Sequence, residues 1–399
     1  MTLLHLAVKT YFCYNYQMNA KIDKLVPGGQ GIATLADGKK AFLWNALPGE
    51  EVEFEVTKNK HSYCEGIATK VISPSPFRIE PKDACYLSTS PWQIIDRTEE
   101  LSQKQSLVKE CLRQQHIDAP VEPTITDGKD FYYRNKMEYS LYWSHEDNLI
   151  YPAFHTRGTH RKSPIAQSSI ERPEIFAEAQ RIIANLNAKH AEARAYQSLL
   201  IRCNQQGKVS SALFENRKPH PVMSLLEDSL CDYKYSYSPN GFFQINLPVY
   251  ELVLKEISKH ITTDKVLDLY AGVGSIGLSV ARNKNLTLVE VNGAAFAEMQ
   301  NNAKGTAANC VLAKSEDVTE YITPDCTVVL DPPRAGCDQK LIEKLNEVQP
   351  EKIIYLSCNP ITQARDLASL QNYHITKLQP YNFFPRTPHI ENLAILEKA

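Results

Sequence analysis

The carboxyl-terminal part of the chain, residues 238–399, repeats a pattern in which an apolar strand ends in a polar, glycine- or proline-containing turn. Four stretches show it: KVLDLYAGVGSIGL, NLTLVEVN, CTVVLDPPRAG and KIIYLSCNP. Strands that are apolar on both faces and alternate with helical patterns predict a parallel, doubly wound sheet. Ligands bind at the carboxyl ends of the strands in such α/β sheets. All four turns fall at these ends, so we expect a ligand site there.

The length of 399 residues predicts two or three domains. Residues 1–19 indicate a leader, either disordered or strand-like, or an early start codon, rather than a signal peptide. In residues 20–75, short alternating strands between glycine and proline turns predict a small five-stranded, OB-like β-barrel. Residues 76–237 mix strands and helices, which indicates a central α+β domain. Its helix near residues 97–115 is expected to pack on the carboxyl-terminal domain, residues 238–399.

The net charge, the length of the apolar runs and the spacing of the cysteines indicate in which cellular compartment the protein works. The net charge of -2 gives no global signature of nucleic-acid binding, and no apolar run is long enough to span a bilayer. The ten cysteines include no C-x-x-C pair and do not cluster as a disulfide framework or a zinc site would. We therefore expect a cytoplasmic, monomeric protein with free thiols and no membrane contact.

Two local segments interleave basic and aromatic residues: GKDFYYRNKMEYSLYW, residues 128–143, and FHTRGTHRK, residues 154–162. Cations that bind phosphates and flat rings that stack on bases are typical of single-stranded RNA recognition. The solvated side of an antiparallel sheet has the same composition, and the residues alone favour that second interpretation.

The glycine-rich turn after the first strand indicates a ligand loop. Gly272, Gly274 and Gly277 allow close approach of the backbone to a ligand, and G-x-G-x-x-G also fits a dinucleotide fingerprint. Glu290 ends the next strand, where an acid can accept both hydroxyls of a ribose. These features predict a cofactor that contains adenosine, either NAD or S-adenosylmethionine. The rigid DPP turn that begins at Asp331 favours S-adenosylmethionine, because it holds an acid and its flanking carbonyls toward the reacting end of the cofactor.

Cys358 ends the apolar strand of KIIYLSCNP, and Pro360 fixes the turn behind it. Free cysteine is usually a small packing residue of the core. Its place at the carboxyl end of a parallel strand, beside the cofactor motifs, predicts instead a thiol presented to a ligand.

The motifs LDLYAGVGSIGL, LDPPRAG, YLSCNPITQARDL and FFPRTPHIENLAIL together resemble those of the RNA 5-methyluridine methyltransferases, which act on transfer RNA or 23S ribosomal RNA. SPNGFFQIN (238–246) and YYRNKMEYS (132–140) extend the resemblance upstream. Residues 20–72 resemble the TRAM domain, an RNA-binding barrel that many members carry. The resemblance implies a class I, S-adenosylmethionine-dependent fold.

The resemblance also implies residue roles. Cys358 is expected to be the nucleophile that adds to carbon 6 of uracil. Glu391 is expected to be the base that removes the proton from carbon 5; without the motif it would be interpreted as an exposed acid on a carboxyl-terminal strand. The positions expected to bind S-adenosylmethionine are Gln244, Tyr270, Ser275, Glu290 and Asp331. Asp331 is expected near the methionine moiety or the uracil edge, whereas Arg334 and His389 receive no role.

The sequence departs from the family at the position of a four-iron cluster that ribosomal members commonly hold. In PKDACYLSTSPWQ only Cys85 is present, and Ser88, Ser90 and Pro91 stand where further thiolates would be sought. PIAQSSIERP, where a later ligand would fall, also contains no cysteine. Because serine is a poor ligand of iron–sulfur clusters, we expect no iron–sulfur cluster and no metal.

Two further positions differ. Some members have Asn where Ser275 stands, and a hydroxyl bonds more weakly there. Near the adenine an acid is usual, but Lys314 or Ser315 stands in its place, so the adenine contact is left unassigned.

The expected function is the methylation of carbon 5 of a uridine in RNA through a covalent cysteine adduct. The barrel favours 23S ribosomal RNA, whereas the missing cluster resembles transfer-RNA members, so transfer RNA is the alternative. A methyltransferase acting on small molecules and a non-catalytic RNA-binding protein are the rival classes.

Overall fold

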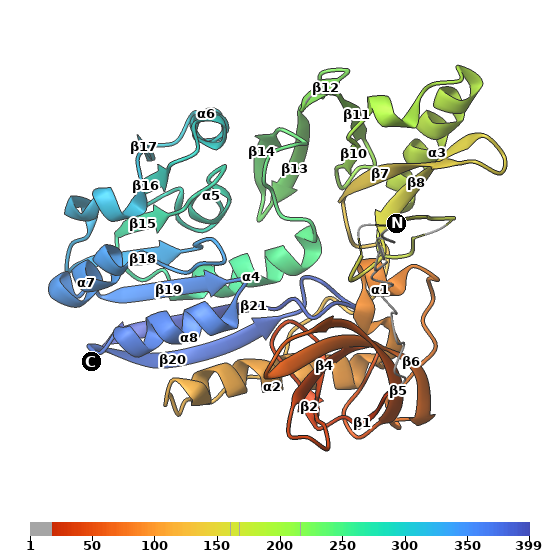
Figure 1. Cartoon of the computed structure of the whole chain (residues 1–399). Helices are drawn as coiled ribbons and strands as arrows, with labels where there is room; N and C mark the ends of the chain where they lie inside the picture. Colours follow the sequence, from red (N-terminus) through yellow and green to blue (C-terminus); the bar gives the residue numbers. More distant parts are fainter. Residues whose placement is uncertain (1–17, 160, 167, 216) are drawn as a thin grey trace, which may run out of the picture. The chain divides into compact units, whose positions relative to one another are not determined.

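The computed structural model describes residues 18–159, 161–166, 168–215 and 217–399 (Figure 1). The chain divides by its internal contacts into two compact units, Met1–Arg78 and Ile79–Ala399. Most of the expected leader, residues 1–17, lies outside the described residues. Among the residues that are described, no helix is both long and apolar enough to cross a membrane.

The first unit is a sheet that closes on itself. Its strands are β1 (Met18–Lys21), β2 (Lys24–Leu25), β3 (Gly31–Thr34), β4 (Lys40–Trp44), β5 (Glu51–Asn59) and β6 (Tyr63–Ser73). They hydrogen-bond in the order β1-β5-β6-β4-β3-β2. Because β1 and β2 are successive stretches of one chain segment and stand at the two ends of this order, the sheet closes into a barrel with five strand positions. Leu43, Val52 and Phe54 are among the side chains that fill it.

A buried ion pair ties the end of this unit to the barrel. The Glu50 side chain has no exposed area, and the Arg78 guanidinium donates to both of its oxygens, at 2.6 and 2.8 Å. The same carboxylate accepts hydrogen bonds from the main-chain amides of Leu47 and Ser75. A buried carboxylate is costly unless it is paired, and these four hydrogen bonds offset the cost of burying Glu50.

We expect Glu50→Ala to destabilise the barrel by about 3 kcal/mol, because it leaves the Arg78 guanidinium partly buried without its partner. Hydrogen exchange of residues 18–78 in the full chain, followed through a urea titration, measures this. Lys70→Ala, which removes the exposed ion pair with Glu53 in the same barrel, is the matched control and should cost less than about 1 kcal/mol. Equal effects of the two substitutions would contradict this account.

The second unit begins with helices and an antiparallel sheet. The elements are α1 (Tyr86–Thr89), η1 (Pro91–Ile94), α2 (Arg97–Gln114), β7 (Lys136–Ser144), β8 (Leu149–His155), β9 (Lys162–Pro164), α3 (Pro173–Ala188), η2 (Ala193–Ala195), β10 (Ser198–Cys203), β11 (Val209–Glu215) and β12 (Lys218–His220). The strand order is β12-β11-β10-β7-β8-β9. Ile175, Ala179 and Ile183 of α3 pack against Tyr139 and Leu199 of the sheet, so α3 covers one of its faces.

The two basic and aromatic segments lie only partly in this sheet: β7 contains residues 136–143 of the first, and β8 and β9 contain only the ends of the second. Tyr139 on β7 is fully buried in the core beneath α3, whereas Tyr132, before the strand, is 43% exposed. Arg134 and Lys136 face the large cavity described below. His160 lies outside the described residues.

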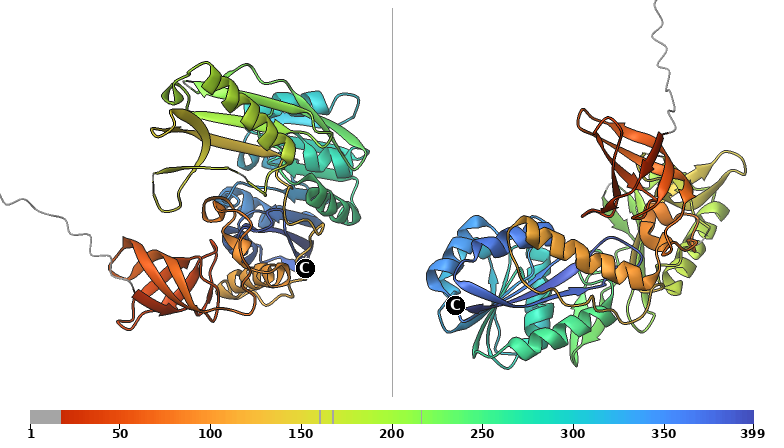
Figure 2. Two further views of the ribbon diagram at one scale, coloured as in Figure 1. Left: turned by 90° about the vertical axis from the view of Figure 1, so that its right-hand side faces the viewer. Right: turned by 90° about the horizontal axis from the view of Figure 1, so that it is seen from below.

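The remaining elements form the expected α/β layer structure. They are β13 (Leu226–Leu230), β14 (Tyr233–Tyr237), α4 (Leu247–His260), β15 (Lys265–Leu269), α5 (Ser275–Ala281), β16 (Asn285–Glu290), α6 (Gly293–Asn302), β17 (Asn309–Leu312), η3 (Ser315–Asp317), η4 (Thr319–Tyr321), β18 (Cys326–Leu330), α7 (Gln339–Val348), β19 (Lys352–Ser357), α8 (Pro360–Ser369), β20 (Tyr373–Tyr381) and β21 (Glu391–Lys398). Helices cover both faces of the sheet (Figure 2). The hairpin β13–β14 shares its buried core, and α2 packs against α8.

The sheet has the order β17-β16-β15-β18-β19-β21-β20. Neighbouring strands are parallel from β17 to β19, but β21 runs antiparallel to both β19 and β20. The four strands expected to be parallel, β15, β16, β18 and β19, are parallel, and β21 adds an antiparallel strand that the sequence analysis did not place. The chain returns from β20 through residues 382–390 without a crossover helix, and such a short connection joins antiparallel strands.

Candidate active site

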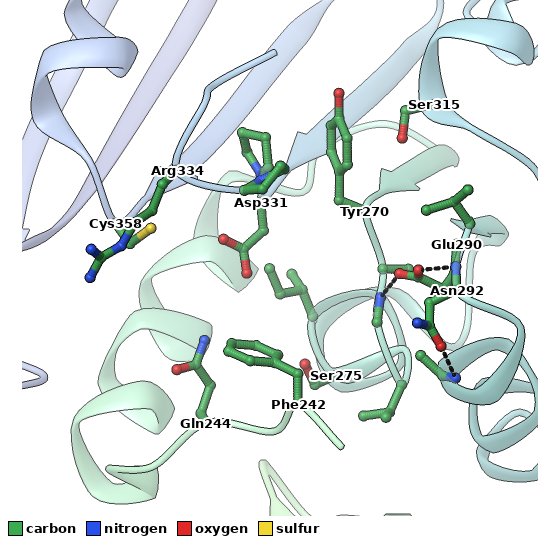
Figure 3. Close-up of a pocket in the computed structure, with 18 of the residues that line it drawn as sticks. Phe242, Gln244, Tyr270, Ser275, Glu290, Asn292, Ser315, Asp331, Arg334 and Cys358 are labelled. Carbon is green, nitrogen blue, oxygen red and sulfur yellow. Dashed lines mark hydrogen bonds between the residues drawn. The ribbon is translucent and has the colours of Figure 1, made fainter. Parts of the chain in front are cut away.

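The turn after β15 adopts left-handed backbone conformations where the sequence predicts a ligand loop. Tyr270 has φ +63°, Gly272 +58° and Gly274 +84°. A Cβ atom at Gly274 would lie 2.9 Å from Cδ1 of Leu278, so a larger residue there would also displace that side chain. At its glycines the turn exposes backbone atoms to the cavity. The Tyr270 side chain projects from the start of the turn toward Ser315 (Figure 3).

Asp268, on β15, stabilises the glycine-rich turn through a hydrogen bond. This residue was not identified from the sequence. One of its carboxyl oxygens, Oδ2, accepts a hydrogen bond of 2.8 Å from the amide of Gly277. A Cβ atom at Gly277 would lie 2.5 Å from a methyl carbon of Leu288, so helix α5 packs directly on β16 there. Burial raises the pKa of Asp268 to about 7.

Glu290 lies at the end of β16, as expected for a residue that binds ribose hydroxyls. Its two carboxyl oxygens accept the amides of Gly272 at 2.8 Å and Asn292 at 2.6 Å (Figure 3). A carboxylate has about four acceptor positions, so two amides leave room for two hydroxyls. The amides orient the carboxylate and connect the glycine turn to the end of β16.

The DPPRAG turn and the first turns of α8 form one unit. The main-chain oxygen of Arg334 accepts hydrogen bonds from Nδ2 of Asn359 at 2.9 Å and Oγ1 of Thr362 at 3.1 Å. Arg365 donates to the main-chain oxygen of Ala335. Polar residues of NPITQARD therefore hold the turn that carries Asp331, which explains why these two motifs occur together.

Cys358 and Glu391 lie at the same end of neighbouring strands. Cys358 directly follows β19, and Glu391 is the first residue of β21. Because β21 runs antiparallel to β19, its amino end lies beside the carboxyl end of β19, and the register pairs Ser357 with Asn392. Glu391 is only 5% exposed, so it is not the exposed acid of the alternative interpretation.

The surroundings of this pair favour its neutral forms. Burial, then the charges of Glu391 and Asp331, raise the pKa of the Cys358 thiol to about 11, while Arg334 opposes this rise. Burial and the charge of Asp331 raise the pKa of Glu391 well above its usual value, again against Arg334. Burial alone raises the pKa of Asp331 to about 7. Among these neighbours Arg334 is the one group that favours the charged forms of both Cys358 and Glu391.

All of the expected site residues line one cavity of ≈ 1610 Å³, and Figure 3 labels all of them except Glu391. They are Gln244, Tyr270, Ser275, Glu290, Asp331, Cys358 and Glu391. Arg334 and His389 line it as well, and an Arg334 nitrogen lies 3.3 Å from Nδ1 of His389. Desolvation and the charge of Arg334 lower the pKa of His389 to about 4, so this ring is neutral at pH 7. Lys314 and Ser315 lie at the cavity wall too.

Phe242 was not singled out from the sequence, yet it lines the cavity with its side chain 74% exposed. The loop that carries it is held by two cations of the central sheet. Arg202, which is fully buried, donates to the main-chain oxygens of Phe243 at 2.6 Å and Gln244 at 3.1 Å. Lys136 donates to the main-chain oxygen of Gly241 at 2.9 Å. The sequence carries no signal that separates Phe242 from the buried Phe243 beside it.

The segment around Cys85 is held together by hydrogen bonds. Oδ2 of Asp83 accepts from Gln93 at 2.9 Å and from both the amide and hydroxyl of Ser169, while Gln93 also donates to Ser90. The two stretches in which cluster ligands were sought thus meet through polar side chains. Within the described ranges, no three His, Cys, Asp or Glu side chains are grouped as a metal would need. The donor set does not fit an iron–sulfur cluster.

The cavity does fit S-adenosylmethionine. Glu290 can accept ribose hydroxyls, and the glycine turn leaves space beside the backbone, where a Cβ atom on Gly272 would meet no atom within 4 Å. Asp331 is an acid whose ionisation is suppressed only by burial, so a positively charged sulfonium ion beside it would favour its carboxylate form.

Comparisons with known proteins agree with this site. Residues 313–399 match the family model described as tRNA (Uracil-5-)-methyltransferase, and residues 249–347 match the Methyltransferase small domain. An uncharacterized RNA methyltransferase of Enterococcus faecalis is 29% identical, with 96% of this chain and 98% of the relative covered. A 23S rRNA (uracil(1939)-C(5))-methyltransferase of Legionella pneumophila is 28% identical, with 95% and 97% covered.

Among solved structures, the Pyrococcus abyssi tRNA (uracil-54, C5)-methyltransferase in complex with S-adenosyl-L-homocysteine matches with a TM-score of 0.76. The identity is 24%, and the match covers 95% of this chain and 99% of the other. It shows that the two chains share a fold. Together with the family model, these matches confirm the resemblance to RNA 5-methyluridine methyltransferases.

The raised pKa values predict that S-adenosylmethionine binds more weakly below about pH 7. A positive ligand favours the carboxylates of Asp331 and Asp268, whose pKa values are both about 7 in its absence. Its affinity should fall by up to about tenfold per pH unit below that value for each proton displaced, and level off above it. S-adenosylhomocysteine lacks the sulfonium charge, so its affinity should change less.

Calorimetric titration of both ligands across this pH range measures the difference. Asp331→Asn should flatten the profile of S-adenosylmethionine toward that of S-adenosylhomocysteine. Parallel profiles for the two ligands in the unmodified protein would show that these carboxyl groups do not respond to the sulfonium charge.

Proposed function

We propose that this relative of the RNA 5-methyluridine methyltransferases transfers a methyl group from S-adenosylmethionine to carbon 5 of a uridine in RNA, through a covalent adduct between Cys358 and the uracil. The observation that carries the proposal is the meeting of Cys358 and Glu391 at one end of β19 and β21, in the cavity that also holds the cofactor motifs. Methylation of carbon 5 of uracil needs a thiolate and a base that both reach the same uracil ring.

Carbon 5 of uracil is too weakly nucleophilic to take a methyl group unaided. When the Cys358 sulfur bonds to carbon 6, the electrons of the carbon 5–carbon 6 double bond move to form an enolate, which makes carbon 5 reactive. After carbon 5 has received the methyl group, the Glu391 carboxylate takes the remaining proton from it. The double bond re-forms and the thiolate leaves as the bond to carbon 6 breaks.

The proposed residue roles follow from the position of each group. Gln244, Tyr270, Ser275, Glu290 and Asp331 would hold the cofactor, which supplies the methyl group and a positive charge when it is bound. Arg334 lowers the pKa of both Cys358 and Glu391 and therefore favours the thiolate and the carboxylate that the two steps require. Asn359 fixes the main chain of Arg334, whose side chain lines the cavity.

RNA is the proposed substrate because basic side chains of a separate α+β region reach the same cavity. Arg134 and Lys136 line it, and their positive charges are proposed to attract phosphate groups, although Lys136 also donates to the main-chain oxygens of Asn240 and Gly241. Residues 20–75 are proposed to be a TRAM-like RNA-binding barrel, residues 76–237 an RNA-binding region and residues 238–399 the catalytic domain, acting as a monomer in the cytoplasm. The barrel as a compact unit favours 23S ribosomal RNA; transfer RNA is the second candidate, supported by the family description.

The proposal predicts that RNA containing 5-fluorouridine traps the protein. Fluorine cannot leave carbon 5 as a proton does, so with S-adenosylmethionine the adduct should persist on a denaturing gel. Cys358→Ala should form none. Glu391→Gln should accumulate an adduct even on RNA with ordinary uridine, because release of the thiolate needs the base. A persistent adduct with Cys358→Ala would contradict the assignment of the nucleophile.

The RNA target is tested by mapping 5-methyluridine in 23S ribosomal RNA and transfer RNA from cells that lack the gene. Loss of one ribosomal 5-methyluridine is the expected result; loss from transfer RNA instead would support the second candidate. A small-molecule methyltransferase would lose neither, and its RNA retention would not depend on residues 1–75.

A further inference from the structure

The segment between β20 and β21, residues 382–390, leads directly into Glu391 and forms a wall of the cavity with Phe384 and His389. Its main chain is fixed largely from outside the catalytic sheet. The Tyr133 hydroxyl donates to the main-chain oxygen of Pro385 at 3.0 Å, and the amide of Trp92 donates to that of Arg386 at 3.0 Å. Sequence segments far from the catalytic motifs thus set the path of this wall.

Two charged residues of α2 meet the same segment from its buried side. Glu100 and Lys104, one helical turn apart, have no exposed side-chain area and lie 3.2 Å from each other. Lys104 Nζ donates to Oδ1 of Asn382 at 2.6 Å and to the main-chain oxygen of Phe384 at 3.1 Å. Oε1 of Glu100 accepts from Nδ2 of Asn382 at 3.1 Å and from the amide of Arg386 at 3.0 Å.

Arg386 completes the contacts. Its φ of +64° is unusual for a residue with a side chain, and its guanidinium is almost fully buried. That guanidinium donates to the main-chain oxygen of Ile95 at 2.6 Å and to the carboxylate of Asp130, and it lies 3.6 Å from Glu100. A non-glycine residue keeps a left-handed conformation only where its surroundings fix it.

Buried charges are costly unless they are paired; Lys104 Nζ and Glu100 Oε1 have their partners in this segment, whereas Glu100 Oε2 accepts no hydrogen bond and has only the Arg386 guanidinium at 3.6 Å. The partners of Glu100 and Lys104 in segment 382–386 are main-chain atoms and one amide side chain, all at fixed places. If the segment moved, both charges would lose partners. The pairs therefore hold the wall in one conformation.

Cys358 is held by different contacts. It follows β19, and the turn of α8 behind it is fixed by Asn359 and Thr362, which bind the DPPRAG turn. The nucleophile and the base are thus anchored separately. Glu391 is the first residue of β21 and directly follows segment 382–390, so these two elements fix its position.

We propose that Glu100, Lys104 and Arg386 form a positioning network that orients Glu391 and its cavity wall for removal of the carbon 5 proton. The inference rests on the proposed function. Loss of the network should slow release of the methylated uridine from Cys358 more than it slows formation of the adduct. None of the three residues touches the reacting atoms in this account; each acts through the 382–390 segment.

The test uses the full chain with two network variants. Glu100→Gln/Lys104→Met removes both charges together, so neither is left buried and unpaired. Arg386→Gln probes the network from the segment itself. The control is Arg113→Gln, which breaks an exposed ion pair with Glu110 on the same helix α2.

Single-turnover reactions with RNA containing ordinary uridine measure adduct formation and product release separately. In both network variants, release should slow by about tenfold while formation changes by less than about twofold, so the covalent complex accumulates. Hydrogen exchange of residues 382–391 should speed up in both variants. Arg113→Gln should match the unmodified protein in all three measurements.

An equal fall in formation and release, as expected from a merely structural role, would overturn the proposal. Unchanged exchange of residues 382–391 in both variants would also overturn it, whatever the activity. Failure of the unmodified protein to form an adduct with 5-fluorouridine RNA would instead refute the proposed function, and the exchange measurement would still decide whether the network holds the segment.

Discussion

The antiparallel pairing of β21 with β19 is the constraint on which the site depends. A parallel strand after β19 would present its carboxyl end at the ligand edge, and a residue at its start would lie at the opposite edge of the sheet. Because β21 is reversed, its first residue, Glu391, lies beside the residue that follows β19, Cys358. The two groups of the proposed chemistry therefore lie at one end of this strand pair, while the three parallel strands β15, β16 and β18 carry the cofactor motifs.

A second consequence of this geometry is electrostatic. Asp268, Asp331 and Glu391 all face the same cavity, and burial raises the pKa of each above its usual value. Burial therefore favours the protonated forms of these acids and the thiol form of Cys358. A cationic ligand would shift Asp331 toward its charged form, and Arg334 favours the charged forms of Cys358 and Glu391. The proposed nucleophile and the proposed base would thus depend on positive charge that is brought or held close to them.

Much of the site could be predicted from the sequence because each motif lies where an apolar strand ends. The glycine turn, Glu290, the DPP turn and Cys358 follow from this rule alone, whereas Glu391 needed the family resemblance, since an acid that opens an apolar strand has no distinctive pattern. The direction of β21 could not be inferred, because apolar strands look alike whichever way they run.

Glu100 and Lys104 were missed for another reason: on a helix of mixed composition they resemble an ordinary exposed i, i+4 pair, and their burial depends on residues about 280 positions later. Phe242 was missed because exposure of an aromatic side chain is a property of the folded loop.

The central claim, that Cys358 is the covalent centre of the site, is tested most directly by locating the adduct on the chain. A second cysteine, Cys337, lines the same cavity but is buried, and its pKa is raised to about 12. The protein is incubated with S-adenosylmethionine and RNA containing 5-fluorouridine, then digested and examined by mass spectrometry. The account predicts that the peptide with Cys358 carries a methylated fluorouridine nucleotide. An adduct on Cys337 or on any other residue, or none at all, would contradict it.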